Sequence, residues 1–260
     1  MNTHQRAASA AVLCAALALG VTACGGSSSS KSATGGSSTA ASASSSPTSA
    51  SASVDPLAAM TGSAIVGKAE ADLRAASSVR MTGSGTNAGT AFNVALDLAP
   101  GKGCDGTIST AGTGSFDIVV IGTKVWIKPD NAFWQKEGGS DAIALQLLQG
   151  KYLEDSTTST GLGSLSSLCD LTKTLSDTTG DVTTAVKGPD TMFDGQKALT
   201  LLDPSKGGTM TVSDAAVPEV LQIHKVGSDA GTLNLTDFNA PVTLTPPPAS
   251  ETIDGSKYGL

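Results

Sequence analysis

The sequence predicts an α+β fold dominated by an antiparallel sheet. Three observations lead to this class. Apolar and polar residues alternate with a period of two in many short segments after Val79, as strands with one buried face require. Stretches with the three- and four-residue spacing of helices precede and interrupt these segments. The two patterns do not alternate strand by strand, which argues against a parallel sheet.

Residues 1–23 have the layout of a signal peptide. Arg6 precedes an uncharged run of small and apolar residues from Ala7 to Val21, and the run is shorter than the roughly 20 residues that a membrane-spanning helix needs. Ala23, Cys24, Gly25 and Gly26 then resemble the lipobox of bacterial lipoproteins. That resemblance implies acylation of Cys24, an anchor in the membrane through diacylglyceryl-Cys24, and a location on its extracytoplasmic face. An ordinary cleaved signal with an incidental Cys24 is the alternative.

Residues 24–55 are predicted to be the acylated cysteine and a flexible linker. Residues 25–55 contain 14 Ser, 6 Ala, 4 Gly and 3 Thr, a composition that cannot bury enough apolar surface to offset its ordering entropy. As a coil, the linker would hold a folded domain roughly 30 Å from its anchor.

Residues 56–260 are predicted to form a single domain that begins with a helix. Ser63 is the expected cap, and Ile65, Ala69 and Leu73 recur at helical spacing. Four or five strands follow, including 92–98, 115–121 and 124–128. Gly122 and Thr123 read as a tight hairpin turn between the last two.

Two further helices and a second group of strands complete the prediction. Ser140 and Asp141 are expected to open a helix that stops at Gly150, and a third helix is expected near residues 165–175. Strands return around the pairs Leu199 and Leu201, Met210 and Val212, Leu221 and Ile223, and Leu233 and Leu235, with glycine-rich turns between them.

Composition and motifs disfavour an enzyme. The chain has 16 Lys+Arg against 23 Asp+Glu, so it lacks the basic footprint of a nucleic-acid binder. His224 lies in an alternating strand pattern without a nearby nucleophile motif, and one such histidine cannot complete a transition-metal site. There is no phosphate-binding loop. We expect no catalytic residue, no metal and no cofactor.

Cys104 and Cys169 are predicted to form a disulfide. Once Cys14 leaves with the signal peptide and Cys24 is acylated, they are an isolated pair in a compartment that permits oxidation. The bond would tie a strand to the third helix. Two buried free thiols are the alternative.

Three of the nine aromatic residues, Trp126, Phe133 and Trp134, lie within nine positions. They form either a core corner after the hairpin or the rim of a mouth that faces a ligand or a membrane.

A family resemblance rests on several segments. These are Ser78–Gly83, the block from Gly106 to Lys128 with Ala132-Phe133-Trp134 after it, Phe193-Asp194-Gly195-Gln196, and the closing stretch from Gly231 to Asp254. Together they resemble the LppX/LprG-type envelope lipoproteins. The resemblance implies a strongly curved antiparallel sheet, an open half-barrel with helices packed on its concave face, as in LolA-like carriers. Members of that group hold lipid or acyl chains between sheet and helices.

The first functional hypothesis is therefore a non-enzymatic envelope lipoprotein that binds or carries a lipid or another hydrophobic ligand. One face of the strands would line the ligand site: Phe92, Val94, Leu96, Phe116, Ile118, Val120, Leu199, Leu201, Met210, Val212, Leu233 and Leu235. The same residues would be ordinary core in a filled domain. The second hypothesis is an envelope interaction module with a filled core that presents a surface to a protein or cell-wall partner, whose identity the sequence leaves unknown.

Overall fold

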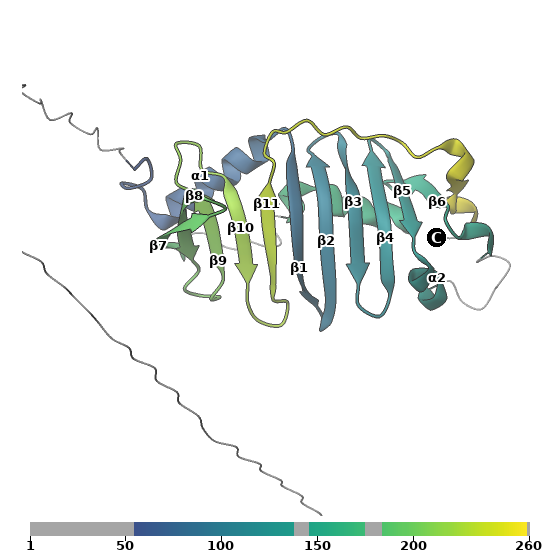
Figure 1. The fold of residues 1–260 in the computed structure, drawn as a ribbon, viewed down its shortest axis with the longest axis horizontal. Coiled ribbons are helices and arrows are strands. Elements are labelled where there is room, and N and C mark those ends of the chain that lie inside the picture. The colour runs from purple at the N-terminus through teal and green to yellow at the C-terminus, as the bar shows by residue number, and fades with distance from the viewer. Residues whose placement is uncertain (1–54, 138–145, 175–183, 259–260) are drawn as a thin grey trace, which may run out of the picture. The chain divides into compact units, whose positions relative to one another are not determined.

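A computed structural model describes residues 55–137, 146–174 and 184–258 of the chain (Figure 1). Its main feature is one open sheet of twelve strands in the order β12-β6-β5-β4-β3-β2-β1-β11-β10-β9-β8-β7. All neighbours are antiparallel except β12 and β6. The sheet is curved and a few helices accompany it, so the predicted α+β class is confirmed.

Most strands are between five and ten residues long, and each follows a segment of alternating or small residues. They are β1 Val79–Asn87, β2 Thr90–Ala99, β3 Gly103–Thr110, β4 Gly114–Ile121, β5 Lys124–Pro129, β6 Tyr152–Ser156, β7 Val186–Phe193, β8 Gln196–Leu202, β9 Thr209–Ser213, β10 Val220–Lys225, β11 Gly231–Thr236 and β12 Thr252–Asp254. The helical elements are α1 Gly62–Ala75, α2 Asn131–Glu137, and the 3-10 helices η1 Leu162–Cys169, η3 Ala249–Glu251 and η4 Gly255–Tyr258.

Two runs of sequentially adjacent antiparallel strands form the sheet and meet at its middle. β1 to β6 follow one another in space as in sequence, and so do β7 to β11. The runs join where β1 pairs with β11, for example Met81 opposite Leu235. α1 contacts β7, β8 and β10, whereas η1 contacts β5 and β6. The first helix therefore packs on strands from the end of the chain.

α1 forms where the sequence predicted a helix, with a different cap. The Thr61 hydroxyl accepts a hydrogen bond from the Ala64 backbone N–H at 3.2 Å, so Thr61 and not Ser63 is the N-cap residue. Ile65, Ala69 and Leu73 lie one helical turn apart and are all buried in the core that the sheet also forms. Burial of this stripe against the sheet stabilises the helix.

Several predictions need correction or lie outside the described residues. The helix expected from Ser140 falls largely in the undescribed range 138–145; its described end, residues 146–148, is helical. The third predicted helix is a 3-10 helix, η1, followed by a separate helical turn at residues 171–174. Residues 131–137, where the sequence analysis predicted no helix, form α2. The Asp130 carboxylate caps this helix by accepting from the Phe133 backbone N–H at 2.7 Å.

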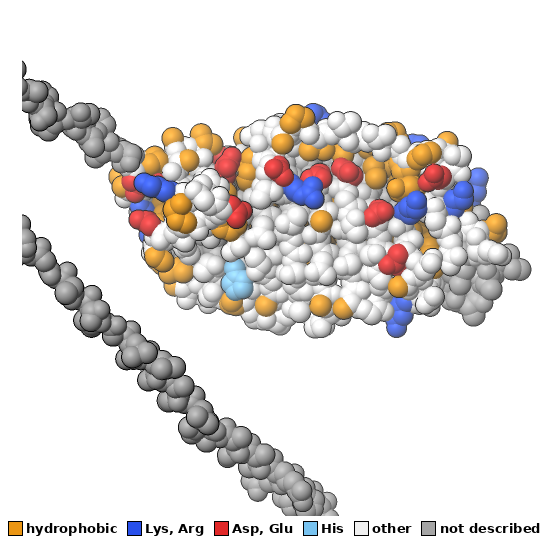
Figure 2. All heavy atoms as spheres, in the orientation of Figure 1, with side chains coloured by type: hydrophobic (Ala, Val, Ile, Leu, Met, Phe, Trp, Pro, Cys, Tyr) orange, Lys and Arg blue, Asp and Glu red, His pale blue; other side chains and the backbone are white. Residues whose placement is uncertain are grey.

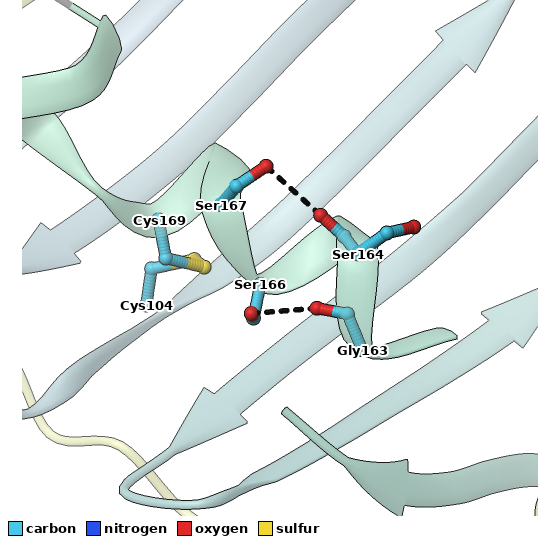
Figure 3. Close-up of a disulfide and its surroundings, with 6 residues drawn as sticks. All are labelled: Cys104, Gly163, Ser164, Ser166, Ser167 and Cys169. Carbon is cyan, nitrogen blue, oxygen red and sulfur yellow. Dashed lines mark hydrogen bonds between the residues drawn. A yellow bond between two sulfur atoms is a disulfide. The ribbon is translucent and has the colours of Figure 1, made fainter. Parts of the chain in front are cut away.

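The structure contains the disulfide between Cys104 and Cys169 (Figure 3). Cys104 is fully buried in β3, and Cys169 is the last residue of η1. Serine hydroxyls reinforce the helix internally: Ser166 donates to the Gly163 carbonyl at 2.6 Å and Ser167 to the Ser164 carbonyl at 2.8 Å. The bond fixes a short helix, with little intrinsic stability of its own, to the sheet.

Reduction of this disulfide should lower the free energy of unfolding substantially. The two cysteines are 65 positions apart, and closing a loop of that length restricts the unfolded chain by about 4 kcal/mol in the chain-entropy model. Urea unfolding with and without reductant, and of the Cys104→Ser/Cys169→Ser double variant, measures the difference. Peptide mapping that finds both thiols free and alkylatable in natively secreted protein would contradict the bond itself.

Candidate functional site: the inner face of the sheet

The twelve residues predicted to line a ligand site all lie on one face of the sheet. Strand pairing sets Leu201 opposite Met210 and Leu199 opposite Val212. Met210 is opposite Ile223, which is opposite Leu233. In the other half of the sheet, the row that contains Val94 continues through Ile108 to Phe116. We call this the inner face; the buried stripe of α1 packs in the same core.

Burial divides the inner face into two zones. The first zone is closed, since its side chains are no more than 7% exposed: Leu96, Ile118, Val120, Leu199, Leu201, Met210, Val212 and Leu235. The second zone contains Phe92, Val94, Phe116 and Leu233, each of which is only half-buried. Ile108, on the same face, is half-buried as well. Large apolar side chains thus remain partly accessible along one part of the inner face.

Glycines form the floor of this accessible zone. Gly83 lies between Val94 and Leu233, and Gly85 lies between Phe92 and Gly231. A Cβ on Gly83 would come within 2.4 Å of the Thr232 carbonyl oxygen and 2.6 Å of Leu233 Cδ2. Only glycine fits there, because a neighbouring side chain leans across the strand at this point. The sequence analysis did not single out these glycines, since isolated glycines in a strand pattern give no sign of what lies across from them.

A groove of about 340 Å³ opens beside the glycines. Phe92, Ile223 and Leu233 contribute its apolar lining. Lys225 and Asp229 also line it, and both are exposed. Lys225 is opposite Gly231 in the strand pairing. Polar side chains complete the lining: Ser84, Thr86, Asn87 and Thr232. A groove with one apolar side and one polar side fits a ligand that has an apolar part and a polar part.

Two buried polar atoms accompany the core. Glu70 of α1 is 7% exposed; its Oε2 accepts from Arg74 at 3.0 Å, while its Oε1 has no hydrogen-bond partner in the described chain. Trp134 of α2 is 4% exposed and its Nε1–H is likewise unpaired among the described residues. Buried polar groups without partners are uncommon. Neither residue lines the groove of about 340 Å³.

The predicted aromatic cluster is split between the two faces. Phe133 packs edge-on against Phe116 and Trp134, with ring centroids 6.1 and 5.9 Å apart. Trp126 lies on the opposite face, since it alternates with the inner residues Val125 and Ile127. Its Nε1–H donates to Glu154 Oε2 at 2.9 Å. Phe133 and Trp134 therefore adjoin the accessible zone, and Trp126 does not.

The outer face carries polar side chains, and Figure 2 shows most of its centre free of hydrophobic and charged groups. Charged side chains on this face include an ion pair between β1 and β2. Arg80 Nη1 donates to both Asp97 oxygens, at 3.0 and 2.9 Å. Burial raises the pKa of Asp105, and the neighbouring Asp97 adds to the effect. His224 is exposed on this face, and its Nδ1 lies 3.0 Å from the Thr232 hydroxyl.

The described ranges hold no group of three or more His, Cys, Asp or Glu side chains placed to bind a metal ion. In the same ranges, none of the helices has both the length and the apolar character needed to cross a membrane.

The fold is that of LppX/LprG-type lipoproteins. LprF from Mycobacterium bovis matches 72% of this chain and 96% of its own, with 15% sequence identity and a TM-score of 0.50. The lipoprotein LppX from Mycobacterium tuberculosis matches 70% of this chain and 97% of its own, at 11% identity and a TM-score of 0.45. An uncharacterized conserved protein from Thermus thermophilus covers 73% of this chain, with 96% of its own length matched, at 10% identity and a TM-score of 0.35.

No family model matches the sequence, and no curated protein matches it. At 15% identity the likeness to LprF shows a shared fold and nothing finer. The resemblance to LppX/LprG-type lipoproteins is therefore confirmed at the level of the fold.

Substitution of a floor glycine should be costly, in contrast to a helical glycine. Gly83→Ala forces the Thr232 carbonyl and Leu233 to shift, so we expect a loss of roughly 1 to 3 kcal/mol in the free energy of unfolding. Gly67→Ala in α1 meets nothing within 4 Å and should stabilise by roughly 0.5 to 1 kcal/mol. Urea unfolding of both variants checks the pair. Equal stability of Gly83→Ala and wild type would contradict the close approach at the floor.

Proposed function

We propose that this protein is a membrane-anchored, non-enzymatic lipoprotein whose domain binds or carries a lipid or another hydrophobic molecule. The observation that carries the proposal is the accessible zone of the inner face. Phe92, Val94, Phe116 and Leu233 are large apolar side chains, yet each is only half-buried. Exposed apolar surface of this kind is unfavourable in water unless something covers it.

Two further features support a hydrophobic ligand. The groove of about 340 Å³ adjoins the zone, and small-molecule sites commonly have a volume of roughly 300 to 1,000 Å³. The fold is that of LprF, and the sequence resembles a group whose members hold lipid between sheet and helices. In this proposal the acyl chain lies along the half-buried apolar residues, and its polar end lies near Lys225.

The closed zone and the accessible zone should respond differently to an added ring. Leu233→Trp should fill the accessible zone, block binding of a fluorescent fatty acid and change stability little. Leu201→Trp, in the closed zone, should overpack the core and cost roughly 1 to 3 kcal/mol. Leu202→Trp is the matched control, since Leu202 is 37% exposed and alternates with the inner residue Leu201; it should retain binding and stability.

Three measurements distinguish a ligand site from a filled core. They are probe titration and urea unfolding of the wild type and the three variants, and mass spectrometry of lipid extracted from the wild-type domain. If Leu233→Trp destabilises as much as Leu201→Trp and the wild type yields no lipid, the inner face is a filled core. That result would favour the second hypothesis, an envelope interaction module, over the lipid carrier.

The anchor is part of the proposal and is tested separately. Cys24 lies outside the described residues, so the lipobox pattern alone supports its acylation. Cys24→Ala should give a protein that no longer partitions with membranes, because a covalent lipid supplies the apolar surface that holds a lipoprotein in the bilayer. Detergent-phase partitioning, with mass spectrometry of the N-terminal peptide, measures this. An unmodified N-terminal peptide in the wild type would show that the lipobox reading is wrong.

A further inference from the structure

A second groove lies on the outer face, away from the proposed lipid site. It has a volume of about 670 Å³ and runs between β2, β3 and β4 on one side and α2 on the other. Eight polar side chains contribute to its lining: Asn93, Ser109, Thr110, Thr113, Ser115, Asp130, Gln135 and Lys136. Strand pairing sets Asn93, Ser109 and Ser115 opposite one another in a row.

The wall of this groove is held rigidly against the sheet. A Cβ on Gly114 would come within 2.4 Å of the Phe133 backbone nitrogen, so α2 packs directly on the first residue of β4. Asp130 connects the two elements: it accepts from the Ser115 hydroxyl at 2.7 Å, from the Ser115 backbone N–H at 3.0 Å and from the Phe133 N–H at 2.7 Å. These hydrogen bonds hold the pKa of Asp130 below its ordinary value, and the bond from the Phe133 N–H has the largest effect.

The lining excludes two classes of ligand. Its hydrophobic side chains are the three alanines Ala91, Ala111 and Ala132, which offer little surface to a lipid or an aromatic molecule. Its one carboxylate, Asp130, is occupied by three donors, and Lys136 is its one cation. A metal ion or a highly charged anion would thus find too few partners.

The polar groups of the lining suit a neutral ligand rich in hydroxyl groups. The Asn93 amide donates to the Ser109 hydroxyl at 3.3 Å, which leaves the Asn93 carbonyl oxygen and the Ser109 hydroxyl hydrogen pointing to no partner in the described chain. Gln135 of α2 is exposed and adds a further amide. Amides and hydroxyls both donate and accept, as the hydroxyls of a sugar do.

We propose that this outer groove is a binding site for a neutral glycan. Asn93 and Ser109 bind sugar hydroxyls from the sheet, and Gln135 binds them from α2. The site is separate from the inner face, so it does not depend on the proposed lipid ligand. Without an aromatic platform in the lining, affinity for a single chain is weak, with a dissociation constant of roughly 0.1 to 1 mM.

The test uses the full mature chain carrying Cys24→Ser and a panel of neutral tetrasaccharides built from glucose, galactose, mannose, arabinose or N-acetylglucosamine. NMR titration should show shift changes confined to the groove with at least one of them. Asn93→Ala/Ser109→Ala should weaken that binding about tenfold or more, since two hydrogen bonds are lost. Gln135→Ala should weaken it by less.

Gln222→Ala/Thr232→Ala is the matched control. Gln222 donates to Asn234 across strands at 2.8 Å on the same outer face, but neither Gln222 nor Thr232 lines this groove. The control and Leu233→Trp should both bind the tetrasaccharide as the wild type does. A sulfated tetrasaccharide is titrated alongside the neutral panel. The proposal is overturned if no neutral tetrasaccharide binds, if Asn93→Ala/Ser109→Ala binds with wild-type affinity, or if only the sulfated tetrasaccharide binds.

Discussion

Burial of the inner face is the interaction on which the rest of the structure depends. A wide sheet presents every second side chain to this face, and its apolar area is too large to stay in water. α1 covers the part formed by β7, β8 and β10, and η1 covers the part formed by β5 and β6. Between these covers lie Gly83 and Gly85, where no side chain rises from the strand. The accessible zone exists because the described helices cover the two flanks of the face.

Side chains alternate between the two faces of each strand, so a single sheet carries an apolar inner face and a polar outer face. Val125 and Ile127 join the core, while Trp126 between them bonds to Glu154 on the other side. A shift of pairing by one residue would exchange the two faces completely. The register is therefore under strong constraint, and it keeps the two proposed ligand sites on opposite sides of the same strands.

The alternating pattern was sufficient to predict the inner face, whereas the pairing of Cys104 with Cys169 was predicted because the other two cysteines were assigned to the signal peptide and the lipobox. Phe92 to Leu98 and Met210 to Val212 carry their signal within a few residues, so no long-range information is needed. The cap of α1 was assigned two residues late because Thr61 and Ser63 both carry suitable hydroxyls. α2 was missed because seven residues are too few to establish a helical period. Asp130 three residues before Phe133 was the available signal.

Other features depend on contacts that no local pattern records. The order of the strands places β1 beside β11, and the sequence of neither strand indicates which strand it pairs with. In the sequence, the floor glycines look like ordinary interruptions of a strand. Their role becomes clear only from the strand pairing, which sets Gly85 opposite Gly231. The outer groove was not predicted either, because its two walls come together only when α2 packs on Gly114. The sequence thus predicted which residues share the inner face, but it did not predict the shape of the site that they form.

The strand order also sets when the protein can finish folding. During synthesis α1 is the first described helix to be made, yet β8 and β10, which it contacts, are made much later. The two halves of the sheet join where Arg80 pairs with Thr236, and these residues are far apart in sequence. Long-range pairings of this kind slow folding, because loop entropy is lost before contacts compensate for it. A growing chain that has reached only β6 therefore holds half a sheet and an apolar helix with no strands to pack on, and it needs protection from aggregation until its last strands arrive.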